Sequence, residues 1–164
     1  MKDQCIYSLQ YDQWANLKLL DHIEQLPEDV FDKPMNSVFP TIAETFYHIF
    51  RGKRIWFKRS LPHLVMDESI TDFHNIPHAK ESFVKLHNIL IEAVHDHYEN
   101  LDVIVYQSPK GNTFQNQFHE IIFHLANHGT YHRGNIAAMI RECGYKGTST
   151  DYIQFLRDTA KNKT

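Results

Sequence analysis

Three histidines on one predicted helix are the residues in this chain with the clearest capacity for chemistry. His124, His128 and His132 are spaced four apart within the stretch Phe118–Cys143. Side chains at i and i+4 lie one above the other on a helix, so two such imidazoles can bind one metal ion. His124 and His132 are separated by about 12 Å of helical rise, which is too far for all three to share an ion. We therefore expect one neighbouring pair to bind, with His128 and His132 the better placed.

The pair alone does not establish a metal site. The chain contains 12 histidines, and a helical histidine is commonly just solvated or hydrogen-bonded, so an i, i+4 pair also arises by chance. A metal site further requires a third ligand from a different helix, because structural and catalytic zinc sites use three or four protein ligands. In that case His124 either supports the ligands or belongs to the polar surface.

The elements that would position these histidines are helical. Apolar residues recur at helical spacing in four long segments, which predict helices at about 4–26, 40–60, 79–101 and 118–143. A shorter helix is expected at about 149–157, and residues 61–78 lose the period and form a long connection. Two short strands at 103–113 are a weaker possibility. The predicted fold is all-α, a single 1–164 domain built as a four-helix bundle with one long crossover loop and a short C-terminal helix.

The second of these helices offers a third ligand. His48 lies just beside the apolar stripe of that helix, on a face that also carries Thr41, Thr45 and Gly52. Small neighbours allow an ion or a partner helix to approach closely. A partly exposed histidine on a helix flank is the alternative reading, yet His48 is the best-placed candidate to complete the pair.

Composition excludes several classes of function. The 164 residues carry a net charge of −3, with a sequence pI near 6.4, whereas nucleic-acid binding requires a basic patch. No apolar run is long enough to span a membrane, and the N-terminus lacks the apolar region of a secretory signal. Two cysteines without a CxxC spacing suggest free thiols in a reducing compartment. We expect a cytoplasmic protein that binds neither nucleic acid nor membrane.

The histidine motif also carries a family resemblance. The run His124-x3-His128-x3-His132-Arg133-Gly134-Asn135, with YDQWANLKLL at 11–20 and ETFYHIFRGKRIWF at 44–57, resembles the DinB family within the wider DinB/YfiT-like superfamily. The similarity covers nearly the whole chain. It implies a helical bundle in which His48, His128 and His132 bind one divalent ion, and a homodimer. Members of the family often have Gln at the position of Asn135.

The resemblance also implies a class of chemistry. Three imidazoles leave an open coordination position, as in catalytic metal sites, and superfamily relatives include thiol-dependent transferases. We therefore expect a zinc or nickel ion and a small-molecule substrate, with a low-molecular-weight thiol as cosubstrate and transferase or hydrolase-like activity. His124, Arg133 and Asn135 are candidates to support the ligands or contact substrate, while no catalytic acid or base is evident. The alternatives are a non-catalytic metal-binding stress-response protein and a structural helical dimer without metal.

Overall fold

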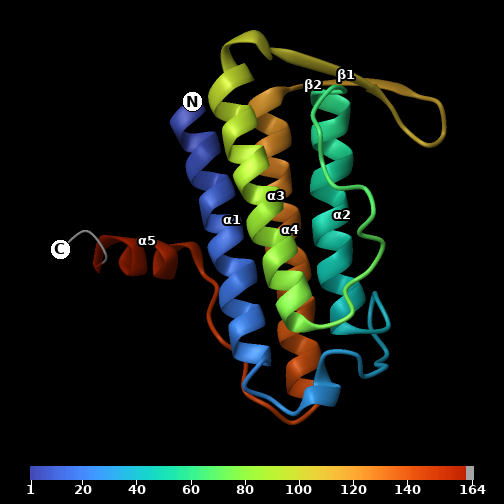
Figure 1. Cartoon of the computed structure of the whole chain (residues 1–164), viewed down its shortest axis with the longest axis vertical. Helices are drawn as coiled ribbons and strands as arrows, with labels where there is room; N and C mark the ends of the chain where they lie inside the picture. The colour runs from blue at the N-terminus through green and yellow to red at the C-terminus, as the bar shows by residue number, and fades with distance from the viewer. Residues whose placement is uncertain (162–164) are drawn as a thin grey trace.

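Four long helices lie side by side and make up most of the molecule (Figure 1). The computed structural model describes residues 1–161. The helices are α1 (Lys2–Ile23), α2 (Ile42–Ser60), α3 (Ile76–His97) and α4 (Phe118–Glu142), followed by the shorter α5 (Tyr152–Lys161). Two 3-10 turns (Glu28–Val30 and Tyr98–Asn100) and two strands, β1 (Val103–Gln107) and β2 (Thr113–Gln117), complete the chain in this range. Figure 1 shows α5 projecting away from the long helices beside α1.

Local signals in the sequence set where the long helices begin and end. The Thr41 side chain accepts a hydrogen bond from the Glu44 backbone at the start of α2, and Asn75 caps α3 in the same way. A reciprocal pair of bonds between Gln117 and Glu120 caps α4. Helix α3 starts at Ile76, three residues before the predicted start, because Asn75 caps it and Pro77 is tolerated in a first turn.

The core is apolar and lies between the long helices. Helix α1 packs against α3 and α4, and α2 packs against α4. Aromatic rings from α2, α3 and the α2–α3 connection meet at the centre of this core: Phe46, Phe50, Phe73 and Phe83. No helix in the described part of the chain is long and apolar enough to cross a membrane. The long connection predicted between the second and third helices is present, at residues 61–75.

The prediction of an all-α fold was wrong in one region. Strands β1 and β2 form an antiparallel hairpin in which Val103 pairs with Gln117 and Gln107 with Thr113. β-branched and aromatic residues favour the extended conformation of β1, and Gly111 adopts a positive φ of 82° in the turn. The protein is therefore mostly helical with a small two-stranded sheet, which Figure 1 shows extending from one end of the long helices.

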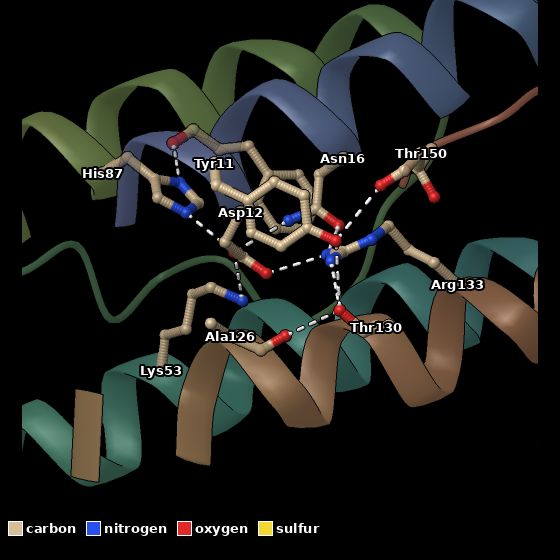
Figure 2. Close-up of polar contacts among 10 residues, drawn as sticks. Tyr11, Asp12, Asn16, Lys53, His87, Ala126, Thr130, Arg133 and Thr150 are labelled. Carbon is tan, nitrogen blue, oxygen red and sulfur yellow. Dashed lines mark hydrogen bonds and ion pairs between the residues drawn. The ribbon is translucent and has the colours of Figure 1, made fainter. Parts of the chain in front are cut away.

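A buried carboxylate connects the four long helices (Figure 2). Asp12 on α1 has a side chain only 1% exposed. Lys53 Nζ of α2 lies 2.8 Å from Asp12 Oδ2, and Arg133 Nη1 of α4 lies 2.8 Å from Oδ1. His87 Nε2 of α3 lies 3.0 Å from Oδ2. Each of the other three long helices thus contributes one side chain to the same carboxylate.

Neighbouring side chains complete this network. Asn16 donates from Nδ2 to Asp12 Oδ2 and accepts from Arg133 Nη1. Arg133 Nη2 donates to the hydroxyl of Thr130. Burial by itself raises the pKa of Asp12, but the charges of Lys53 and Arg133 and the contact with His87 hold that pKa well below its usual range. Asp12 is therefore a charged carboxylate in the interior.

Gly129 has no side chain, and this leaves room for the buried side chains of Asp12 and Arg133. A Cβ on Gly129 would overlap Asp12 Oδ1 and lie 2.7 Å from Arg133 Nη1, whereas a Cβ on Gly134 of the same helix would meet nothing within 4 Å. Because alanine favours a helix over glycine, Gly134→Ala should raise the free energy of unfolding by about 0.5–1 kcal/mol. Gly129→Ala should lower it by about 1–3 kcal/mol, because the buried side chains must shift.

Urea denaturation of both variants, followed by circular dichroism, checks this pair. Equal stabilisation by the two alanines would show that Asp12 and Arg133 are not held against Gly129.

Candidate metal site

Three histidines from two helices converge at one point. His48 Nε2 on α2 lies 3.1 Å from His128 Nε2 on α4, and His132 Nε2 lies 3.2 Å from the same atom. The rings of His48 and His132 approach within 4.5 Å between centroids. One potential ligand atom from each of the three residues lies within 4.8 Å of the other two. Among the described residues, these three form the group that could hold a metal ion. We call these residues the His cluster.

The spacing of the His cluster fits one tetrahedral ion. Imidazole nitrogens bind zinc at about 2.0–2.1 Å, which places two ligand nitrogens about 3.3 Å apart. A ring nitrogen has only one in-plane lone pair or N–H, so His128 Nε2 cannot form good hydrogen bonds to both neighbours. A ring nitrogen that lies about 3 Å from two other ring nitrogens is readily explained by a shared cation. The residues present therefore fit a divalent metal.

The surroundings keep these imidazoles neutral, as metal binding requires. Burial, followed by the neighbouring rings of His132 and His48, lowers the pKa of His128 to about 4. Burial, followed by the charges of His48 and Lys53, lowers the pKa of His132 to about 4. The pKa of His48 is also lowered, mainly by burial. Near neutral pH the lone pairs of all three rings are available.

Apolar and small residues border the His cluster on two sides. Phe39, from the loop before α2, packs its ring 4.5 Å from His48 and 5.7 Å from His132 between centroids. Gly52 faces His128, because an added Cβ would touch His128 Cε1 at 3.5 Å. His132 Nδ1 is buried with no hydrogen-bond partner among residues 1–161, so packing holds this ring in position.

The remaining residues named from the sequence lie outside the His cluster. The ring of His124 lies 5.7 Å from that of His128, one turn away and tilted against it, and does not join the three converging nitrogens. Arg133 points towards Asp12: its Nη1 donates to Asp12 Oδ1, and its Nη2 donates to the hydroxyl of Thr130. This position favours the interhelical ion pair over contact with a substrate. Asn135 is partly buried, and its Nδ2 has no hydrogen-bond partner within the described residues.

Sequence reasoning missed the residues that support the His cluster. Asp12 and Lys53 lie in the helical stretches YDQWANL and FRGKRIWF, at helical spacing from the apolar residues of the core face (Leu9 and Leu19; Ile49 and Phe57). A charge at a core position of a helix usually has a buried partner, so this signal was available in the sequence. Phe39 is in a loop with no periodic pattern, and no signal pointed to it.

Comparison with known proteins shows which family the chain matches. The model of the DinB family matches residues 1–164. The chain is also similar to the protein named "Protein DinB" of Bacillus subtilis (strain 168), with 28% identity over 171 residues. The match covers 99% of this chain and 99% of that protein. The resemblance expected from the histidine motif is thus confirmed over the full length.

Metal content provides the first prediction from this site. We expect the protein to bind about one divalent ion per chain and to lose it in His48→Ala and in His128→Ala, because either change leaves two ligands. His124→Ala, on the same helix one turn from His128, is the matched control and should retain the metal. Elemental analysis of untagged protein after incubation with zinc or nickel measures the stoichiometry. Metal retained in His48→Ala would eliminate the cross-helix site.

The lowered pKa values predict a pH dependence for the metal-free protein. His128 and His132 have an ordinary value near 6.5 when unfolded and about 4 when folded. Between these values the unfolded chain binds more protons, so stability is complete above about pH 6.5 and falls as the pH drops towards 4. His128→Gln should make this fall shallower.

Urea midpoints measured at several pH values across this window provide the test. His95→Gln is the control, because His95 lies exposed with its ring beside Asp96. A pH dependence that is unchanged in His128→Gln would contradict the burial of this ring.

Proposed function

This chain belongs to the DinB family, and from that premise we propose that it is a metal-dependent thiol S-transferase. In the proposed reaction a low-molecular-weight thiol attacks a small electrophile and forms a thioether. The observation that carries the proposal is the His cluster itself: three neutral imidazoles from α2 and α4 that converge on one point. Three nitrogen ligands leave a tetrahedral ion with one open position, the arrangement that catalytic zinc sites use.

The bound ion would supply one chemical effect. A divalent cation lowers the pKa of a thiol that binds to it, so the sulfur is a nucleophilic thiolate near neutral pH. Zinc and nickel both suit a site of three imidazole nitrogens and accept a sulfur ligand. We propose one of these two as the ion in the cell.

The protein's own residues would position this chemistry rather than transfer protons. His48, His128 and His132 fix the ion, while Phe39 packs against two of the three rings. Glu120, which lies on the same helix, caps α4 through its Oε2 atom. In the balanced reaction a carbon–sulfur bond forms, the bond to the leaving group breaks, and the thiol proton passes to water. No acid or base from the chain is needed in this step.

We also propose an oligomeric state and a cellular location for the protein. We propose that the four long helices act as a four-helix bundle of the metal-binding kind and that two copies form a homodimer, as the family resemblance implies. We also propose that the protein works in the cytoplasm, where low-molecular-weight thiols are kept reduced.

Turnover is the decisive experiment. Zinc- or nickel-loaded protein should accelerate thioether formation between a thiol (mercaptoethanol, cysteine or glutathione) and chlorodinitrobenzene at neutral pH. A thiol with an ordinary pKa near 8.5 is only a few per cent thiolate at that pH, so full ionisation predicts a rate gain of roughly tenfold or more. His128→Ala should abolish the gain, and His95→Ala should keep it. Stoichiometric metal without turnover of any pair would favour the non-catalytic metal-binding stress-response protein.

A further inference from the structure

A cavity of about 240 Å³ lies in the groove between α2 and α4, next to the His cluster. Two aromatic rings, three polar side chains and one aliphatic side chain line it: Trp56, Tyr106, Asn116, Glu120, His124 and Ile121. A cavity of about 150 Å³ is enough to bind benzene. The volume here therefore suits a single ring with a substituent.

His124 joins the cavity to the His cluster. Its ring lies 5.7 Å from the ring of His128 on one side and 5.4 Å from the ring of Trp56 on the other, between centroids. One helical turn, about 6 Å of rise, separates His124 from His128. Phe39 packs against the His cluster at His48 and His132, whereas His124 lies between His128 and the cavity.

The walls of the cavity are held rigidly. Trp56 and Tyr106 meet edge to face at 4.8 Å, and Arg59 lies over both rings. Tyr106 donates its hydroxyl hydrogen to Asn116 Oδ1 at 2.8 Å within the hairpin. Asn116 Nδ2 in turn donates to Glu120 Oε2 at 3.2 Å, which ties the hairpin to the start of α4. The hairpin that the sequence did not clearly predict thus forms one wall of the cavity.

The polar side of the cavity offers hydrogen-bond acceptors and a negative charge. Glu120 Oε2 accepts from the Gln117 backbone at 2.9 Å and from Asn116 Nδ2 at 3.2 Å. Within residues 1–161 both of these bonds end on the same oxygen, which leaves Oε1 for a ligand. These bonds also hold the pKa of Glu120 below its usual value. Beside Glu120 a ligand with an ammonium or another donor is favoured over an anionic group, whereas the positive charge of Arg59 lies over the two aromatic rings.

From these observations we propose that the cavity binds the organic part of the thiol whose sulfur occupies the metal. The group that fits is a flat ring, joined to the sulfur by a short linker and carrying an ammonium or another hydrogen-bond donor. Trp56 and Tyr106 contact the ring, Glu120 receives the donor, and His124 lies beside the linker. This inference rests on the proposed function, because it takes the sulfur to be bound at the His cluster.

The test measures binding rather than turnover. Cobalt-loaded protein is titrated with three thiols, and the sulfur-to-cobalt charge-transfer absorption reports the sulfur on the metal. The probes are para-aminomethyl phenylmethanethiol, its para-carboxy counterpart and mercaptoethanol, which has no ring. We expect the amine-bearing thiol to bind roughly five- to tenfold more tightly than mercaptoethanol, the range of a favourable aromatic contact. The carboxylate-bearing thiol should bind more weakly than the amine.

Two variants test separately the contact between Trp56 and the ring of the thiol and the negative charge of Glu120. Trp56→Ala should remove most of the advantage of the aromatic thiols and leave the affinity for mercaptoethanol within about twofold. Glu120→Gln, which can still cap α4, should shrink the difference between the amine and the carboxylate by roughly threefold or more. Glu142→Gln, an exposed carboxylate on the same helix, is the matched control and should change neither. Metal content and thermal unfolding show that each variant is folded.

The outcomes distinguish this inference from the proposed function. If mercaptoethanol gives the thiolate absorption but the aromatic thiols bind no better, or keep their advantage in Trp56→Ala, the cavity is not the subsite and thiol binding at the metal stands. If no thiol gives the absorption while cobalt is bound, both proposals are overturned.

Discussion

The structure depends on the compensation of one buried carboxylate. Asp12 is removed from water, where an unpaired charge would be unstable by several kcal/mol, so it requires cationic and hydrogen-bonding partners. Lys53, Arg133 and His87 meet it from three different helices. Apolar packing alone permits neighbouring helices to slide in small steps, but a charge with directional partners defines one position. Asp12 therefore fixes the register of all four long helices, a role that buried polar groups also have in coiled coils.

This register also determines where the histidines lie. Helix α2 supplies Lys53 to the carboxylate and His48 to the His cluster, and α4 supplies Arg133 and the pair His128 and His132. On α4 the two sets are interleaved, since Gly129 and Arg133 each follow a ligand by one residue and so face a neighbouring direction. A slip of α4 by one turn, about 5.4 Å, would separate Arg133 from Asp12 and His128 from His48 together. The ion pair and the His cluster are thus two results of the same alignment.

The sequence allowed prediction of periodic features and of features marked by residue type. The apolar period located the four long helices within a few residues, and the spacing of His128 and His132 with the placement of His48 identified the residues that the fold brings together. Non-local features were harder to predict. The hairpin depends on contacts such as that between Tyr106 and Trp56, which a local pattern does not contain. The orientation of Arg133 was decided by Asp12, 121 residues earlier in the chain, so no window of sequence around Arg133 could reveal it.

The groove between α2 and α4 changes its chemistry from one turn to the next. The two helices run in opposite directions (Figure 1), so the α2 positions 48, 52 and 56 lie opposite the α4 positions 132, 128 and 124 in turn. At the first of these three levels the ring of His48 faces that of His132, 4.5 Å away between centroids. At the second level Gly52 leaves room for His128. At the third level Trp56 faces His124 and no ligand is available from α2. Three equally spaced histidines on α4 therefore have different surroundings because the residues opposite them differ. Two of them belong to an ion-binding cluster and the third borders a cavity with aromatic walls, all within two turns of a rigid helix pair.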